Sequence, residues 1–186
     1  MRIGIDIDST LHHYWDQLEA VARRRFGVAL DYHAQVAWGI TDLDPEQLGA
    51  CIAETHDEVL VAGAEPYPGA VEVVRRWHDD ERHFIHITSH RTTAAHEATE
   101  RWLRSIGLPF DDLYCSDDKI ARCAEIGIDV LIDDSPVNLL GAAEAGIRPA
   151  TLLHPWNREL CEGDDRIVCA EDWPRLAAGL APALGR

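Results

Sequence analysis

From residue 67 onward, the chain alternates short apolar segments with amphipathic segments of helical length. Apolar runs predict strands within four segments, 81–89, 113–116, 128–135 and 148–153. Between and after them, periodicity and terminal Gly and Pro residues predict helices over 68–78, 91–107, 116–127 and 136–146. Strands that alternate with helices of this length pair in parallel, with helices on both faces of the sheet. We therefore predict an α/β fold, a three-layer Rossmann-like parallel sheet.

Residues 12–66 interrupt this alternation directly after a first short strand. Their pattern predicts one amphipathic helix over 12–27 and another over 44–60, with irregular structure between them. No strong strand pattern occurs in this segment. We therefore divide the chain into a core of residues 1–11 and 67–186 and a small helical insertion of residues 12–66. The tail is predicted to add a strand over 166–173 and a helix over 174–184.

Two carboxylates, Asp6 and Asp8, lie in the otherwise apolar first strand, beside Ile3, Ile5 and Ile7. Side chains two positions apart on a strand point to the same side. Packed among apolar neighbours, the two carboxylates repel each other and lose hydration unless a cation, a proton or a set of donors compensates them. The pair therefore indicates a functional site at the end of this strand.

Polar side chains also end other predicted strands. They are Asp6, Asp8, Ser9 and Thr10 on the first strand, Thr88, Ser89, His90 and Arg91 on the second, and Asp133 and Asp134 on the fourth. Lys119 begins the helix after the third strand. The carboxyl ends of parallel strands lie along one edge of the sheet, where ligands bind. These acids, hydroxyls and the lysine are therefore predicted to meet on one rim.

Two acidic pairs on one rim need a divalent cation or an equivalent compensating charge. Ligands that are all oxygen favour Mg²⁺, which also binds phosphate oxygens. Hydroxyls of Thr88 or Ser89 and the Lys119 ammonium are suited to hold the remaining phosphate oxygens, an assembly for phosphoryl transfer. If Ser116 caps its helix, Lys119 lies in the first turn, where the dipole disfavours a cation. Either neighbouring aspartates neutralise Lys119, or its position is functional.

Composition restricts the partners and the location of the protein. Lys and Arg number 17 against 33 Asp and Glu, a formal net charge of −16, which argues against binding a nucleic-acid polymer but not a small phosphorylated substrate. Without a membrane-spanning apolar run or a signal segment, we expect a soluble cytoplasmic protein that does not bind membranes.

Five scattered cysteines are expected to be reduced and mostly buried. The run of His83, His86 and His90 does not predict a zinc site, because no second cluster supplies the remaining ligands at recognised spacings.

Four motifs in this order resemble those of the haloacid dehalogenase superfamily of phosphohydrolases. They are the DxDST at Asp6 to Thr10, the strand-end pair Thr88 and Ser89, the isolated Lys119, and the acid pair in VLIDDSP at Asp133 and Asp134. The resemblance spans nearly the whole chain. The segment IDVLIDDSPVNLLGAAEAGI and the later HPWNR look like the 5′(3′)-deoxyribonucleotidase-like proteins within that superfamily. The family fold has a small helical cap after the first strand, here residues 12–66.

The resemblance implies a role for each of these residues. Asp6 would be the nucleophile that forms an aspartyl-phosphate, and Asp8 the general acid and then the general base. Asp6, the backbone carbonyl of Asp8, and Asp134 would bind Mg²⁺, with Asp133 as a supporting partner or alternate ligand. Thr88 and Lys119 would hold the phosphoryl oxygens. The implied activity is hydrolysis of a small phosphate ester, such as a nucleoside monophosphate.

The sequence leaves several residues open. Ser9 stands where this family commonly has glycine, so its side chain must fit where the backbone approaches the substrate. Arg91 is as consistent with an exposed helix start as with a phosphate contact, and we leave it out of the catalytic set. Tyr14, Trp15 and Trp38 are suited either to a wall against a nucleobase or to the apolar core of the insertion.

Two other functions share these residue types. A signalling domain with a phosphorylated aspartate also uses acid pairs, a hydroxyl residue and a lysine, but receiver domains place the acid pair first and have no insertion. A phosphomutase would need a second phosphate pocket, which the sequence does not exclude, and a phosphatase for a non-nucleotide metabolite fits the same motifs. Dehalogenation needs neither Mg²⁺ nor Asp8, so the intact acid set argues against it.

Overall fold

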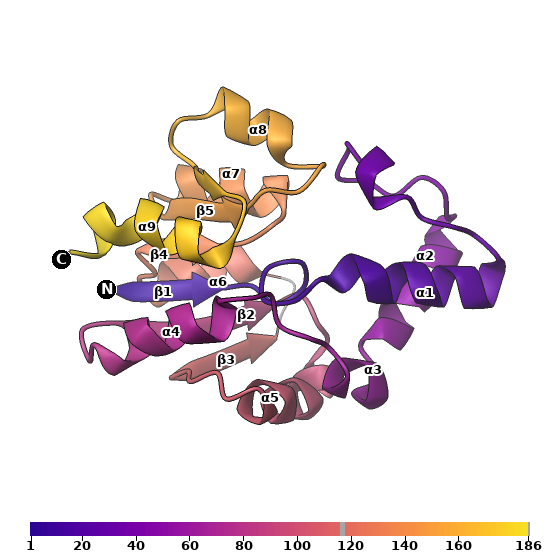
Figure 1. Cartoon of the computed structure of the whole chain (residues 1–186), viewed down its shortest axis with the longest axis horizontal. Helices are drawn as coiled ribbons and strands as arrows, with labels where there is room; N and C mark the ends of the chain where they lie inside the picture. Colours follow the sequence, from indigo (N-terminus) through magenta and orange to yellow (C-terminus); the bar gives the residue numbers. More distant parts are fainter. Residues whose placement is uncertain (116–117, 186) are drawn as a thin grey trace.

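A parallel sheet of six strands forms the centre of the computed structural model, which describes residues 1–115 and 118–185 (Figure 1). The strands are β1 (Arg2–Ile5), β2 (Phe84–Ser89), β3 (Asp112–Cys115), β4 (Val130–Ile132), β5 (Arg148–Leu152) and β6 (Val168–Ala170). Their order is β3-β2-β1-β4-β5-β6, and every neighbouring pair is parallel. The strand order reverses around β1, which lies between β2 and β4. This confirms the predicted fold class and places the ends of β1 and β4 side by side.

Helices cover both faces of the sheet and make the three layers. They are α4 (Ala70–Asp79), α5 (His96–Ser105), α6 (Lys119–Glu125), α7 (Pro136–Glu144) and α9 (Trp173–Leu184), whereas the short helix α8 (Arg158–Gly163) buries none of its residues. Helices α4 and α9 pack on the face that carries Ile3 and Ile5, whereas α6 and α7 pack around Leu131 on the other (Figure 1). The strand side chains alternate between these two apolar clusters, as expected for a sheet buried on both sides.

The insertion extends beyond the carboxyl edge of the sheet (Figure 1). It contains α1 (Tyr14–Phe26), a short 3₁₀ turn η1 (Tyr32–Ala34), α2 (Pro45–Thr55) and α3 (Glu58–Ala62). Helices α1 and α2 pack on each other around an apolar cluster of their own, which includes Trp15 and Cys51. One core residue, Trp156, joins this cluster and so connects the insertion to the sheet.

The prediction of one helix over 44–60 is wrong, because the chain leaves the helix at His56 and Asp57. Asp57 has an extended backbone, with φ −66° and ψ 148°. The break turns α3 onto α5 rather than continuing along α1. The prediction of a helix ending at Gly27 is confirmed, since Gly27 closes α1 in a left-handed conformation.

Strand β1 is shorter than predicted and ends at Ile5, so Asp6 and Asp8 follow the strand instead of lying within it. The Ile7 carbonyl accepts hydrogen bonds from the backbone amides of Thr10 and Leu11, which makes a tight turn. Asp8 therefore reaches the rim through this turn, whereas Asp6 precedes the turn and its backbone amide still donates to the Ile132 carbonyl of β4 at 2.8 Å.

The expectation that all five cysteines are reduced is wrong for one pair. Cys161 at α8 and Cys169 in β6 form a disulfide with a Cα–Cα distance of 6.1 Å. Cys51, Cys115 and Cys123 are free and buried, as expected. Sequence spacing did not reveal the pair, because the short helix α8, which brings the two residues together, was not predicted. The predicted strand and helix of the tail are confirmed as β6 and α9.

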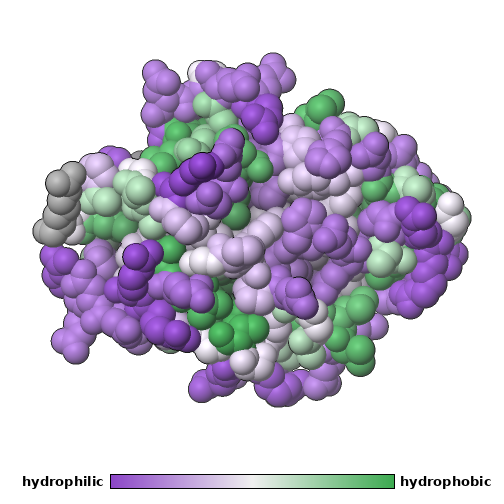
Figure 2. All heavy atoms as spheres, viewed as in Figure 1, coloured by the Kyte–Doolittle hydropathy of each residue, from purple (hydrophilic) through white to green (hydrophobic). Residues whose placement is uncertain are grey.

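Charged and polar side chains cover much of the face shown in Figure 2, with apolar patches between them. No helix in the described part of the chain has the length and apolar character needed to cross a membrane.

The disulfide should stabilise the C-terminal part of the core. Replacing both Cys161 and Cys169 by Ser should lower the free energy of unfolding by about 2–3 kcal/mol, since the bond closes a short loop. Urea unfolding with and without dithiothreitol measures this loss. The reductant should weaken the wild type and leave the double variant unchanged, whereas an equal response of both proteins would show that the bond does not contribute.

Candidate active site

A cavity of about 370 Å³ lies at the carboxyl edge of the sheet, between the core and the insertion. The core supplies its charged residues, Asp6, Asp8, Lys119, Asp133 and Asp134. The insertion supplies much of its wall, including Tyr14, Trp15, Trp38 and His56. The strand-end acids and the lysine that the sequence predicted to meet are therefore brought to one cavity.

Lys119 joins two of the acids across the floor of the cavity. Its Nζ donates to Asp6 Oδ1 at 2.6 Å and to Asp133 Oδ2 at 2.7 Å, and only 2% of its surface is exposed. Burial opposes the charge of the ammonium, but Asp133 and Asp6 together raise its pKa above the usual value. The residue begins α6, whose N-cap is Asp118; the predicted cap Ser116 lies outside the described residues. Lys119 is therefore a fixed cation between two carboxylates.

Asp133 is held on every side by donors. Besides Lys119, its Oδ1 accepts the backbone amide of Ser135 at 2.9 Å, and both oxygens accept from Asn138 Nδ2 at 3.0 and 3.1 Å. Asn138 lies in the first turn of α7. This carboxylate thus connects the end of β4 to α6 and α7. Its hydrogen bonds hold Lys119 in position.

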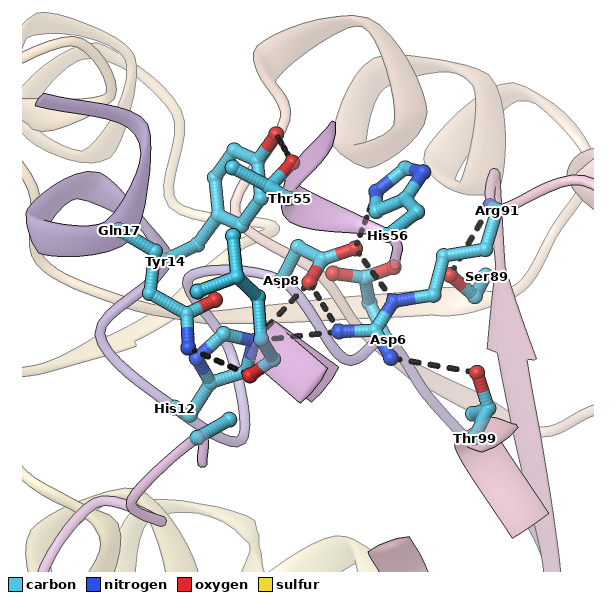
Figure 3. Close-up of polar contacts among 12 residues, drawn as sticks. Asp6, Asp8, His12, Tyr14, Gln17, Thr55, His56, Ser89, Arg91 and Thr99 are labelled. Atoms are coloured by element: carbon cyan, nitrogen blue, oxygen red, sulfur yellow. Dashed lines mark hydrogen bonds and ion pairs between the residues drawn. The ribbon is translucent and has the colours of Figure 1, made fainter. Parts of the chain in front are cut away.

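Asp8 occupies a second ion-pair network, drawn in Figure 3. Arg91 binds both of its oxygens, through Nε at 3.1 Å and Nη2 at 2.6 Å. The ring of His12 lies 2.9 Å from Oδ1 and that of His56, from the insertion, 3.6 Å from Oδ2. Burial raises the pKa of Asp8, but Arg91, His12 and His56 outweigh it and hold the pKa well below the usual range. Asp8 is therefore ionised here.

Arg91 is the main site residue that the sequence reasoning left out. Only 1% of its surface is exposed, and its Nη1 also donates to Thr99 in α5 at 3.2 Å. The sequence could have indicated this role through the position of Arg91, which lies two residues after a buried strand that ends in hydroxyl side chains. His12, His56 and Trp156 were also missed, because their roles depend on how the insertion folds back onto the core.

Asp6 and Asp134 carry the unbalanced negative charge of the cavity. Burial, followed by the repulsion of Asp133 and Asp8, raises the pKa of Asp6 from 3.8 to about 7 despite Lys119. Burial and the charges of Asp6 and Asp133 also raise the pKa of Asp134 above its usual range. Asp134 lies nearly buried at the end of β4, and among the described residues no group donates a hydrogen bond to its carboxylate.

The carboxylate oxygens of Asp6 and Asp134 are the type of ligand that a hard cation prefers. Nitrogen and sulfur ligands are not needed, and the raised pKa values of Asp6 and Asp134 mark a deficit of positive charge that Mg²⁺ would relieve. Within residues 1–115 and 118–185, no three His, Cys, Asp or Glu side chains are arranged to hold a metal ion. The expected ligand set needs only two carboxylates and one backbone carbonyl.

Thr88 and Ser89 lie at the end of β2 but differ in their surroundings. Thr88 is buried, and its Oγ1 has no hydrogen-bond partner within the described chain. Ser89 Oγ accepts the backbone amide of Arg91 at 3.1 Å. Neither residue belongs to the cavity wall, so Thr88 offers a spare hydroxyl beside the site whereas Ser89 holds the turn that presents Arg91.

Aromatic rings also line the cavity. Trp15 stacks on Trp156 with 5.6 Å between centroids, and Trp38 lies 6.3 Å from the same ring. Trp15 is buried, whereas 46% of the Trp38 surface is exposed. Tyr14 also borders the cavity, and its hydroxyl is bonded to Thr55 Oγ1 at 2.7 Å. The rings thus serve both as core of the insertion and as lining of the cavity.

A sequence profile described as 5′ nucleotidase, deoxy (pyrimidine), cytosolic type C protein matches residues 1–173. Comparison with curated proteins finds no significant match.

Several solved structures share the fold at low sequence identity. A haloacid dehalogenase-like hydrolase from Streptococcus pneumoniae has a TM-score of 0.67 at 15% identity, over 91% of this chain and 93% of its own. A HAD family hydrolase from Deinococcus radiodurans, with bound phosphate and sodium, has a TM-score of 0.67 at 18% identity, over 98% and 94%. The D,D-heptose 1,7-bisphosphate phosphatase from B. bronchiseptica, complexed with magnesium and phosphate, has a TM-score of 0.56 at 15% identity, over 96% and 97%.

The raised pKa of Asp6 predicts how the stability of the metal-free protein depends on pH. The folded carboxyl keeps its proton up to about pH 7 while the unfolded one releases it near 3.8, so this contribution to stability is lost as the pH rises between these values. Between about pH 4 and pH 7.5 the wild type should lose a few kcal/mol more than Asp6→Asn in urea unfolding with EDTA. Mg²⁺ at the higher pH should restore stability to the wild type only. If the free energies of unfolding of the two proteins change equally with pH, the raised pKa of Asp6 is not the cause of the pH dependence.

The Arg91 and Asp8 pair gives a second prediction. Arg91→Leu leaves a partly buried carboxylate without its main partner and should lower the free energy of unfolding by about 3–5 kcal/mol. Arg101→Leu is the matched control, because Arg101 is 55% exposed and its ion pair with Glu58 should contribute less than about 1 kcal/mol. Urea unfolding measures the loss of free energy in both variants. Similar losses would show that the buried pair contributes no more to stability than an exposed one.

Proposed function

The chain belongs to the family of 5′ nucleotidases, deoxy (pyrimidine), cytosolic type C, and on this premise we propose that its cavity hydrolyses nucleoside monophosphates. The chain has the fold of the haloacid dehalogenase superfamily and is a phosphoric monoester hydrolase. The proposal is carried by one observation: a buried carboxylate, Asp6, is held by a lysine in a cavity that both acids and aromatic rings line.

Asp6 is the proposed nucleophile. Lys119 holds one of its oxygens, and the other, Oδ2, is available to attack phosphorus in line with the ester bond. The new bond joins Asp6 to phosphorus while the bond from phosphorus to the ester oxygen breaks. Lys119 and the unpartnered hydroxyl of Thr88 are the groups proposed to hold the phosphoryl oxygens, since Lys119 contacts this carboxylate and Thr88 follows Ile87, the strand partner of Ile5.

Asp8 is the proposed acid and base. It gives a proton to the departing alcohol and then accepts a proton from the water that attacks the aspartyl-phosphate, which breaks the bond to Asp6 and releases phosphate. Its low pKa in the resting site requires that substrate change its surroundings. A phosphate beside Asp8 adds negative charge and competes for Arg91, and both effects raise the pKa of Asp8.

Asp6, the backbone carbonyl of Asp8, and Asp134 are proposed to hold Mg²⁺, with Asp133 as a support or alternate ligand. When bound, Mg²⁺ supplies positive charge at the phosphoryl oxygens and keeps Asp6 ionised. Asp133 is already occupied by Lys119, Ser135 and Asn138, which favours the supporting role.

The aromatic wall supports a nucleotide as substrate. Residues 12–66 are proposed to act as a cap that closes one side of the cavity with Trp15 and Trp38, while the core adds Trp156. Planar rings and acids in the wall of the same cavity suit a nucleobase whose phosphate lies at Asp6. A phosphate ester without a ring would contact the acids and Lys119 without stacking on these rings.

Removal of the nucleophile tests the reaction itself. Asp6→Asn should lower Mg²⁺-dependent phosphate release from a panel of nucleoside monophosphates by at least about 10³-fold, because no covalent step remains. Asp79→Asn changes an exposed aspartate outside the cavity and should keep wild-type activity. Undiminished phosphate release by Asp6→Asn would exclude the proposed nucleophile.

Removal of one ring tests the substrate class. Trp38→Ala should raise the KM for a nucleoside monophosphate by about 10-fold through the loss of stacking, with little change in the KM for glycerol 2-phosphate. Val59→Ala, an exposed apolar change elsewhere in the insertion, should alter neither value. If Trp38→Ala raises both KM values equally, or if glycerol 2-phosphate is the better substrate of the wild type, the ring wall does not select a nucleotide.

A further inference from the structure

Ser9 follows Asp8 directly and has a left-handed backbone, with φ 60°. A residue with a Cβ atom disfavours this conformation, which persists only where neighbouring groups hold it. Glycine, the residue common at this position in the family, adopts it freely. Ser9 is nearly buried and belongs to the cavity wall beside Asp8.

A ring from the core holds the Ser9 backbone. His154 Nε2 lies 2.8 Å from the Ser9 carbonyl oxygen, which is an acceptor only, so Nε2 carries the proton. The other ring nitrogen, Nδ1, lies 2.8 Å from the hydroxyl of Tyr32 and accepts its hydrogen bond. Burial lowers the pKa of His154 to about 4, which keeps the ring neutral and this tautomer in place.

The His154 ring is itself fixed. It stacks on Trp156 with 4.6 Å between centroids and an angle of 2° between the planes. Its backbone amide donates to Asn157 Oδ1 at 2.8 Å, and Asn157 Nδ2 donates in turn to Thr151 and to the Leu152 carbonyl. A second ring, Trp173, donates to the next carbonyl of the turn, that of Thr10, at 2.9 Å. Trp156 and Asn157 thus hold the His154 ring, and with it the Nε2–H donor, in a fixed position.

We propose that His154 is a positioning residue: its Nε2–H holds Ser9 in the left-handed conformation and thereby aims Asp8 at the phosphate ester. Tyr32 belongs to the helical insertion, so its hydroxyl, by donating to Nδ1, connects the insertion to a core histidine whose tautomer the Ser9 carbonyl sets. The proposal rests on the hydrolysis proposed above, in which Asp8 transfers the proton. It also explains how serine replaces glycine at this turn, because the histidine supplies the restraint that glycine does not need.

Four proteins test this coupling: the wild type, Ser9→Gly, His154→Phe and the double variant. Phenylalanine keeps the stacking on Trp156 and removes both ring nitrogens. His154→Phe should lower kcat for a nucleoside monophosphate with Mg²⁺ by about 10- to 100-fold, with a smaller change in KM. In the Ser9→Gly background the same change should lower kcat by no more than about 3-fold, because glycine holds the turn without help. His154→Gln, which keeps an N–H donor, should recover most of the lost kcat.

A measurement without substrate gives an independent readout. The shift of the urea midpoint caused by His154→Phe should be smaller in the Ser9→Gly background than in the wild type, because only serine loses a restraint it needs. Equal fold losses of kcat and equal midpoint shifts in the two backgrounds would overturn the proposal and leave His154 as a general packing residue. If the wild type hydrolyses no phosphate ester, the proposed function fails, and the midpoints still decide whether His154 holds the turn.

Discussion

The buried ion pairs of Lys119 with Asp6 and Asp133 are the interaction on which the rest of the site depends. They join the end of β1, the end of β4 and the start of α6, three segments that are remote in the sequence. Neither carboxylate could stay both buried and ionised without a cation, because the loss of hydration would outweigh the packing around it. The topology brings Asp6 and Asp133 together, and the positive charge of Lys119 reduces the repulsion between them.

The charge balance of the cavity remains incomplete. Lys119 and Arg91 supply two positive charges against the four carboxylates of Asp6, Asp8, Asp133 and Asp134, so two negative charges are left over. The resting pKa shifts of Asp6 and Asp8 are therefore opposite to those that the proposed chemistry needs: the pKa of the nucleophile is raised and that of the acid is lowered. A cation near Asp6 and a phosphate near Asp8 would reverse both shifts. The site is thus arranged to become reactive only when both are bound.

Much of the core could be predicted from the sequence because each element carried its own signal. Alternating strands and helices fixed the parallel sheet, and strand-end acids marked the rim at Asp6, Asp8, Asp133 and Asp134. The misses share a different cause. Arg91, His56 and His154 act through contacts across long sequence separations, and no local periodicity reports such contacts. The break of the helix at His56 and the disulfide at Cys161 likewise depend on how segments fold back on one another.

The central claim is that Asp6 takes the phosphoryl group from the substrate. The most direct measurement is mass spectrometry of the wild-type protein quenched with acid during turnover of a nucleoside monophosphate with Mg²⁺. We expect the peptide that contains Asp6 to gain the mass of one phosphoryl group, and Asp6→Asn to gain none. A phosphoryl group on any other residue, or turnover with no phosphorylated enzyme at any quench time, would contradict the account.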